Sequence, residues 1–208
     1  AGLQIVDLDR GAVAAWRAPP SLEGERWMCT VLRVGIGDGY GAAHVVYRHF
    51  VYPERNVDHV YHAPLDEIAA ASEPIGVITG LSSTPQHLSV TRTHVFAEMQ
   101  PVAVVVAFTA GRWGPVWSEL VDGAIPQEVR GVGDFAFWVA YAGSPRIAYG
   151  SLDRPAAWLR DIAPGRIRTF DTDGVDLAWV EIRDSPPSLE LWTAPVVFDA
   201  ADLRPRRV

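Results

Sequence analysis

Lysine is absent from this chain of 208 residues, and its 18 arginines are the only side chains with a permanent positive charge. A Schiff-base amine, a pyridoxal anchor, a P-loop lysine and the strand lysine of a kinase each require an ε-amino group. Arginine cannot replace that group, because the guanidinium stays protonated and is a poor nucleophile or base. The sequence therefore excludes these lysine-dependent mechanisms.

Cysteine and long hydrophobic runs are scarce as well. The single cysteine, Cys29, excludes an internal disulfide and any Cys-x-x-Cys motif, and it favours a cytoplasmic location. The longest apolar stretch, Pro101 to Ala110, is far shorter than the roughly 20 residues of a membrane-spanning helix. A net charge of -7 argues against nucleic-acid binding through a broad basic surface. We expect no membrane or nucleic-acid partner, and a homodimer stays open.

Motifs for nucleophiles and organic cofactors are also missing. No Gly-x-Ser-x-Gly sequence occurs. The glycine-rich segment 35–41 is followed by a strand-like segment rather than a helix, so no helix N-terminus is available for a pyrophosphate. The sequence predicts no cofactor.

Apolar residues make up 49% of the chain and charged residues 21%, a balance typical of a globular protein. At this length we expect a single domain spanning 1–208. Apolar runs and alternating patterns predict strands at 3–6, 27–34, 43–52, 57–62, 76–81, 87–99, 101–109, 134–141, 146–149, 166–170, 175–183 and 189–193.

Three segments have the end signals of short helices. They are Asp9 to Arg17, which precedes a proline pair, Pro64 to Ser72, which has a proline in its first turn, and Asp153 to Ile162, which precedes Pro164-Gly165. The predicted fold class is therefore α+β to mostly β. We expect a curved antiparallel sheet, as a barrel or sandwich, with two or three short helices.

A weak internal repeat relates about 1–60 to 134–200. Leu8-Asp9-Arg10 followed by Trp16 is echoed by Leu152-Asp153-Arg154 followed by Trp158. Two strand–helix–strand units of this kind are similar to the paired modules of vicinal oxygen chelate proteins, and segment 188–192 resembles the ligand-bearing last strand of that family. The first strands carry no His or Glu where the family has a metal ligand, so no function is carried over.

Four of the six histidines, His44, His49, His59 and His62, lie close together in the sequence among several acidic residues. Imidazole and carboxylate ligands together suit zinc or non-haem iron. On strands, however, the odd spacing of each histidine pair puts its two members on opposite faces. We therefore predict no metal, and a mononuclear metal enzyme stays as an alternative.

The segment 87–99 carries the strongest candidate site. Arg92, His94, Phe96 and Glu98 alternate, so on a single strand all four project from one face, roughly 7 Å apart. A comparable face is predicted on 43–52, and it is formed by His44, Val46, Arg48, Phe50 and Tyr52. The alternative interpretation is that both faces are simply the solvated side of an antiparallel sheet.

This pattern predicts a small-molecule enzyme that works by acid–base catalysis, such as an isomerase, cyclase or lyase. Its substrate would be apolar with one anionic or carbonyl group. His94, Glu98 and His44 would move protons. Arg92 and Arg48 would hold the anionic group, with Tyr52 and Phe96 beside it. A non-catalytic ligand-binding protein is the remaining alternative.

Overall fold

The computed structural model describes residues 2–7, 12–17, 27–51, 55–79, 84–100, 104–118, 125–142, 144–158, 166–184, 186–196 and 206–208. Within these ranges nearly all regular structure is antiparallel β-strand, and the single helical element is the short 3-10 helix η1 (Ile68–Ala70). No helix in these ranges is long and apolar enough to cross a membrane.

An N-terminal hairpin precedes four four-stranded sheets, which we call blades 1 to 4. The hairpin consists of β1 (Gly2–Asp7) and β2 (Ala12–Arg17). Blade 1 consists of β3 (Trp27–Gly37), β4 (Tyr40–His49), β5 (Asn56–Pro64) and β6 (Gly76–Thr79). Blade 2 consists of β7 (Thr84–Val90), β8 (Val95–Gln100), β9 (Val104–Thr109) and β10 (Arg112–Ser118). Blade 3 consists of β11 (Ile125–Val132), β12 (Phe135–Ala142), β13 (Ser144–Ser151) and β14 (Arg154–Trp158). Blade 4 consists of β15 (Arg166–Thr172), β16 (Asp176–Asp184), β17 (Pro187–Pro195) and β18 (Arg206–Arg207).

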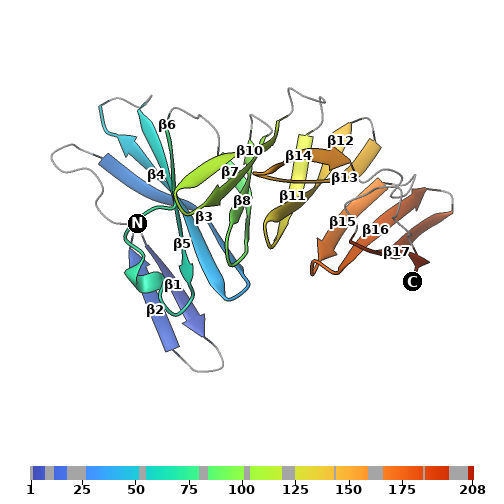
Figure 1. Ribbon diagram of the computed structural model, residues 1–208, viewed down its shortest axis with the longest axis horizontal. Helices are drawn as coiled ribbons and strands as arrows, with labels where there is room; N and C mark the ends of the chain where they lie inside the picture. Colours follow the sequence, from blue (N-terminus) through green and yellow to red (C-terminus); the bar gives the residue numbers. More distant parts are fainter. Residues whose placement is uncertain are drawn as a thin grey trace.

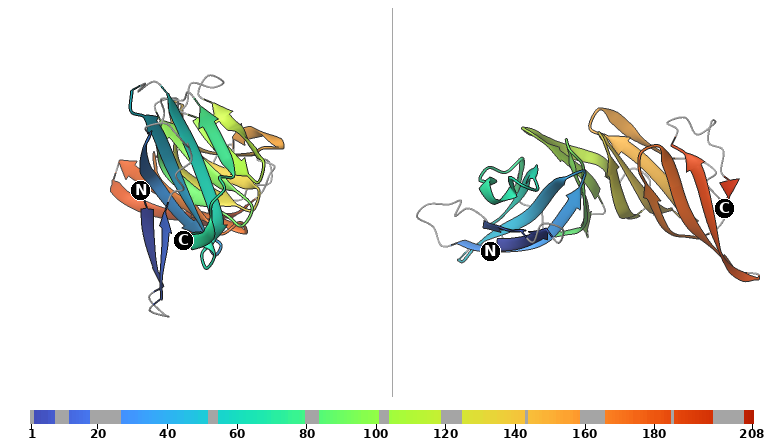
Figure 2. Two further views of the ribbon diagram at one scale, coloured as in Figure 1. Left: turned by 90° about the vertical axis from the view of Figure 1, so that its left-hand side faces the viewer. Right: turned by 90° about the horizontal axis from the view of Figure 1, so that it is seen from below.

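Every blade is a meander in which strands consecutive in sequence pair with each other. The first strands β3, β7, β11 and β15 contact one another in series, so they form the inner side of an open arc (Figure 1). The blades follow one another along this arc (Figure 2, right). Radially repeated four-stranded sheets are the architecture of a β-propeller. The mostly-β prediction is confirmed at this level, but the described strands do not close into a barrel.

The core lies between the blades rather than inside one sheet. Large side chains that are fully or almost fully buried fill each junction: Val60, Ile78, Val95 and Phe108 between blades 1 and 2, Phe96, Val105 and Trp138 between blades 2 and 3, and Phe137, Phe170 and Trp179 between blades 3 and 4. Both faces of blades 2 and 3 are therefore apolar, which explains why their second and third strands have nearly continuous hydrophobic sequences.

The predicted helices are wrong. The described part of Asp9 to Arg17 is strand β2, and the described part of Asp153 to Ile162 contains strand β14, with 159–162 outside the described residues. Within Pro64 to Ser72 only the single turn η1 is helical. Alanine-rich sequence favours helix, but pairing with β1 and burial of Trp16 against blade 1 override that propensity in β2.

The prediction of one strand over 87–99 is also wrong, because a tight turn separates β7 from β8. The Thr91 amide donates a hydrogen bond to the His94 carbonyl at 2.9 Å, and the His94 amide donates to Thr91 Oγ1 at 3.0 Å. A threonine hydroxyl that satisfies a backbone amide in this way stabilises a turn in place of a sheet ladder. The segment contains no glycine, proline, asparagine or aspartate, the residues that normally indicate a turn.

Antiparallel pairing distributes the connections between two edges of the arc. Turns between first and second strands lie at the same edge as those between third and fourth strands. We call this the turn edge and define it by 38–39, 65–75, 91–94, 110–111, 133–134, 152–153 and 173–175. The connections of the opposite edge fall largely outside the described residues. The turn edge is therefore the edge at which the structure describes most of the loops.

Candidate functional site

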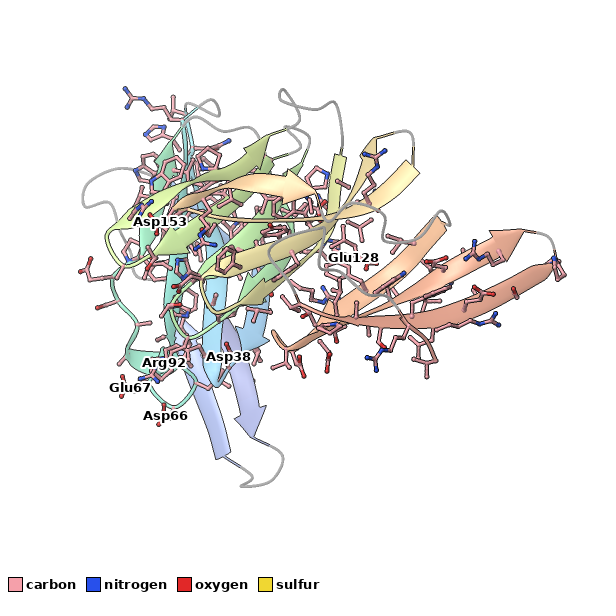
Figure 3. All side chains as sticks on the ribbon, turned by 45° about the vertical axis from the view of Figure 1, so that its right-hand side comes forward. Asp38, Asp66, Glu67, Arg92, Glu128 and Asp153 are labelled. Carbon is pink, nitrogen blue, oxygen red and sulfur yellow. The ribbon has the colours of Figure 1, made fainter. Side chains whose placement is uncertain are left out.

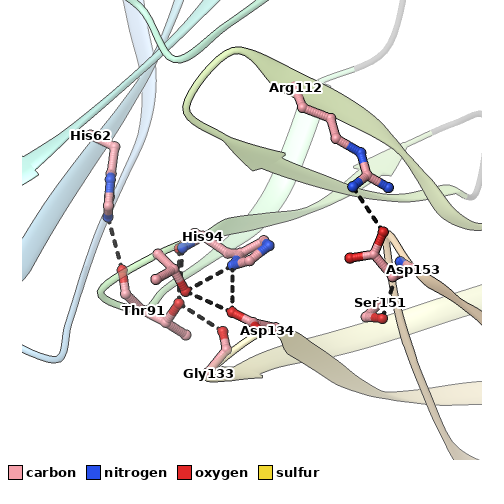
Figure 4. A network of polar contacts seen from close by, with 9 residues as sticks. His62, Thr91, His94, Arg112, Gly133, Asp134, Ser151 and Asp153 are labelled. Atoms are coloured by element: carbon pink, nitrogen blue, oxygen red, sulfur yellow. Dashed lines mark hydrogen bonds and ion pairs between the residues drawn. The ribbon is translucent and has the colours of Figure 1, made fainter.

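A polar network on the turn edge joins blades 1, 2 and 3 (Figure 4). His62 Nε2, at the end of β5, lies 2.8 Å from the Thr91 carbonyl oxygen. Thr91 Oγ1 donates in turn to the carbonyl oxygen of Gly133 at 3.0 Å. The turn at 91–94 of blade 2 thus contacts blade 1 through His62 and blade 3 through Gly133, and both hydrogen bonds are partly buried.

His94 occupies the centre of this network. Its Nδ1 lies 2.9 Å from Thr93 Oγ1 and 3.3 Å from Asp134 Oδ1, and its ring stacks on Phe96 with the centroids 5.4 Å apart. Burial lowers the pKa of His94 below its usual value, and the nearby Asp134 carboxylate opposes that shift. At neutral pH the imidazole is therefore uncharged and able to accept a proton.

A second contact lies further out along the same edge. Arg112, at the start of β10, donates from Nη1 to Asp153 Oδ1 and from Nη2 to the Leu152 carbonyl oxygen, both at 2.8 Å. Both charged side chains are more than half exposed, so the ion pair itself contributes at most about 1 kcal/mol. Its role is to set the position of one turn against the next.

The predicted site on 87–99 is assembled only in part. His94, just before β8, shares one face with Phe96 and Glu98, and this face packs against blade 3. Glu98 is buried and pairs with His87, whose Nδ1 lies 2.8 Å from Glu98 Oε2. Arg92 belongs to the tight turn, where it is exposed. The carboxylate beside the His94 imidazole is therefore that of Asp134, whereas Glu98 pairs with His87.

The second predicted face, on 43–52, lies elsewhere in blade 1. His44 is fully buried, and its Nε2 lies 3.5 Å from Asp58 Oδ2. Arg48 is exposed and pairs with Asn56 near the end of β4 opposite the turn edge. Because Arg92 lies on the turn edge, the two arginines cannot grip one anion together. Tyr52 lies outside the described residues.

The histidines of blade 1 occupy both faces, as their odd spacing predicted. His62 contacts blade 2, whereas the His59 ring packs on Tyr47, 4.7 Å away, on the opposite face. His59 Nδ1 also lies 3.2 Å from the Tyr61 hydroxyl, and burial lowers the pKa of this histidine. Among the described residues no group of three or more His, Cys, Asp or Glu side chains is placed to hold a metal ion.

Exposed acidic side chains gather on the turn edge of the described residues. Wherever the structure describes exposure, the exposed acidic residues lie on the turn edge or directly beside it: Asp38, Asp66, Glu67, Glu73, Asp134, Asp153, Asp171, Asp173 and Asp176. Exposed arginines occur at both edges: Arg92, Arg112 and Arg154 on or beside the turn edge, and Arg48, Arg55, Arg146 and Arg168 at strand ends of the opposite edge. The labelled Asp38, Asp66, Glu67 and Arg92 gather at one end of the first two blades (Figure 3). The Leu65 amide donates to the Gly39 carbonyl oxygen at 2.9 Å, which holds two of these acidic loops together.

No protein-family model and no curated protein sequence matches the chain. Among solved structures, it is similar to one from a structural and mechanistic analysis of two prolyl endopeptidases, with a TM-score of 0.55 and 13% identity. That match covers 94% of this chain and 31% of the other, so the chain spans about a third of the prolyl endopeptidase's length. A putative 6-phosphogluconolactonase from Bacteroides uniformis gives a TM-score of 0.44 at 14% identity, covering 97% of this chain and 62% of that one. YCF48 bound to D1 peptide gives 0.45 at 12% identity, covering 89% and 60%. At 13% identity, the similarity to the prolyl endopeptidase structure concerns the fold alone.

Sequence reasoning missed the residues that connect the blades. Thr91, Thr93 and Asp134 form the hydrogen bonds around His94, yet none belongs to a recognisable motif. The dipeptide Gly133-Asp134 between two apolar strands was the one available signal, because it is typical of a hairpin turn. That this turn meets the turn at 91–94 depends on how the blades pack.

Proposed function

We propose that this chain is a non-catalytic binding module of β-propeller architecture whose turn edge binds a positively charged partner, such as a basic peptide segment. The observation that carries the proposal is the concentration of exposed carboxylates on that edge. A surface of one charge sign raises the local concentration of oppositely charged partners and speeds their association.

The environment of the predicted catalytic residues supports the same choice. His94 links two turns, Phe96 is in a blade junction, and Glu98 is occupied by His87. Each of these side chains has a structural partner in the fold. The arginines expected to clamp an anionic substrate lie on different edges, and Arg92 lies at the same end of the blades as Asp38, Asp66 and Glu67 (Figure 3).

Binding of a nona-arginine peptide, measured by fluorescence anisotropy at low and moderate salt, tests the proposal. The combined variant Asp38→Asn, Asp66→Asn, Glu67→Gln should weaken binding at least tenfold and reduce its salt dependence. The matched control, Arg48→Gln with Arg55→Gln on the opposite edge, should bind the peptide no more weakly than the unmodified chain does. Equal affinities in all three proteins would remove the turn edge as the binding surface.

Acid–base catalysis at His94 is the second candidate, and one contact favours it. The pairing of a largely buried, uncharged imidazole with the Asp134 carboxylate is an arrangement that suits proton transfer. If His94 acts this way, His94→Gln lowers turnover about 10²–10⁴-fold in an assay of the substrate. A turnover that stays unchanged would leave His94 with its role in the blade junction.

A further inference from the structure

The N-terminal hairpin packs against blade 1, where β2 contacts η1 in the connection between the outer strands β5 and β6. Its two strands have the same order and pairing as the third and fourth strands of blades 2 and 3. The sequence supports this equivalence, because Leu-Asp-Arg followed by a tryptophan occurs both between β1 and the end of β2 and between β13 and the end of β14. The internal echo in the sequence therefore falls on two hairpins, β1–β2 and β13–β14.

Trp16 fixes this hairpin on blade 1. Its ring is buried in a cluster with Ala43, Val45, Tyr47 and Tyr61, and its Nε1 donates to the Ala71 carbonyl oxygen at 2.7 Å. This is the face of blade 1 that points away from blade 2. The hairpin thus covers the outer part of that face, as Val116 of β10 covers part of blade 3.

On the inner strand β3 the same face is covered at Trp27, Cys29 and Val31 but uncovered near the β3–β4 turn. Val34 and Ile36 of β3 are 55% and 64% exposed. They point away from blade 2, because a Cβ on the intervening Gly35 would lie 2.9 Å from Val90 Cγ2 in blade 2. At the junction of blades 1 and 2, by contrast, the inner strand β7 covers the inner strand β3. Two large aliphatic side chains are therefore left in water where an inner strand would lie.

Because β2 contacts η1 in the connection between the outer strands of blade 1, the other edge of the hairpin, which belongs to β1, lies on its inner side. In all four blades the third strand pairs on both sides, whereas β1 pairs with β2 alone among the described residues. An unpaired strand edge next to exposed aliphatic side chains is a template for added strands. The edge supplies backbone hydrogen bonds, and the aliphatic side chains supply apolar contact area.

We propose that the space between β1 and β3 is a docking site for an antiparallel β-hairpin. One strand of this hairpin pairs with the free edge of β1, and the other lies innermost. Its apolar side chains, at alternate positions, cover Val34 and Ile36. Two strands are required because an outer pair needs an inner pair to complete a four-stranded blade. The inner hairpin of blade 3, β11–β12, is an example of such a hairpin. Its strand β12 pairs antiparallel with β13 of the outer hairpin, which shares the Leu-Asp-Arg sequence with β1–β2.

A synthetic peptide of residues 125–142 serves as the probe, since it contains β11–β12. We expect saturable binding by fluorescence anisotropy and slower hydrogen exchange of the amides in 2–7. The double variant Val34→Asp, Ile36→Asp should weaken binding at least tenfold. Leu189→Asp, at a leucine of β17 in blade 4 that is 65% exposed, is the matched control and should leave binding unchanged.

Four results would overturn the proposal, and the first three concern the peptide. They are the absence of saturable binding up to 1 mM peptide, equal binding by the double variant, and unchanged exchange in β1 on binding. Sedimentation of the chain alone tests a different occupant. Self-association that the double variant abolishes would assign this surface to a second copy of the chain and refute the hairpin. None of these variants alters the acidic turn edge, so the outcome is independent of the proposed function.

Discussion

Replacing Phe96 by alanine tests whether the face shared with His94 and Glu98 belongs to a blade junction or to a ligand cavity. Phe96 is 0% exposed and packs against blade 3, where a Cβ on Gly131 would lie 2.5 Å from the ring. Burial of a phenylalanine removes about 150–250 Å² from water. At about 25 cal/mol per Å² this corresponds to about 4–6 kcal/mol, and core Phe→Ala substitutions cost about 3–5 kcal/mol. We expect Phe96→Ala to lower the free energy of unfolding by about 4 kcal/mol.

Urea denaturation followed by tryptophan fluorescence and far-UV circular dichroism measures this loss. Phe50→Ala is the matched control, because Phe50 is 71% exposed and its truncation should change stability by no more than about 0.5 kcal/mol. A loss below about 1 kcal/mol for Phe96→Ala would refute the reasoning, since a side chain in a ligand cavity lacks packing partners on one side.

Two further predictions concern the approach of the blades and their response to acid. Gly37→Ala should destabilise the protein by at least about 2 kcal/mol in the same assay, because its Cβ would lie 2.0 Å from the Val90 carbonyl oxygen. Gly39→Ala is the control and should lower the free energy of unfolding by only about 1–2 kcal/mol, because Gly39 has a φ of +75° but no neighbouring atom near the added Cβ. An equal loss of stability in both variants would contradict the close approach of β3 and β7. Burial lowers the pKa of His59, His62 and His94 in the folded state. Near and below the unfolded pKa of about 6.5 the unfolded chain therefore binds more protons than the folded one, and stability is lost as the pH falls. Unfolding titrations between pH 7.5 and 5 should show this loss, and His94→Gln should reduce its slope; an identical slope in the variant would show that His94 does not contribute.

The position of the exposed acidic residues is a feature that the sequence alone does not reveal. Its net charge of -7 indicates only an acidic protein. Because each blade is an antiparallel meander, every second connection falls on the same edge, and residues far apart in sequence such as Asp38 and Asp134 come to lie on it. No local pattern reveals that these acidic residues share an edge, since this depends on strand order and on how the blades follow one another.

Local sequence determined the β-rich character of this protein. Apolar segments such as 104–109 and 135–142 form strands because their valine, phenylalanine and tryptophan side chains fit pleated, buried surfaces. The alternation along 94–98 likewise determined that His94, Phe96 and Glu98 share a face. Tertiary structure alone decided that this face meets another blade, that the alanine-rich segment ending at Trp16 is a strand, and that a turn interrupts 87–99. The physical reason is the same in each case. Burial against a neighbouring blade contributes more free energy than local propensity does, and no local pattern in the sequence indicates which blade is the neighbour.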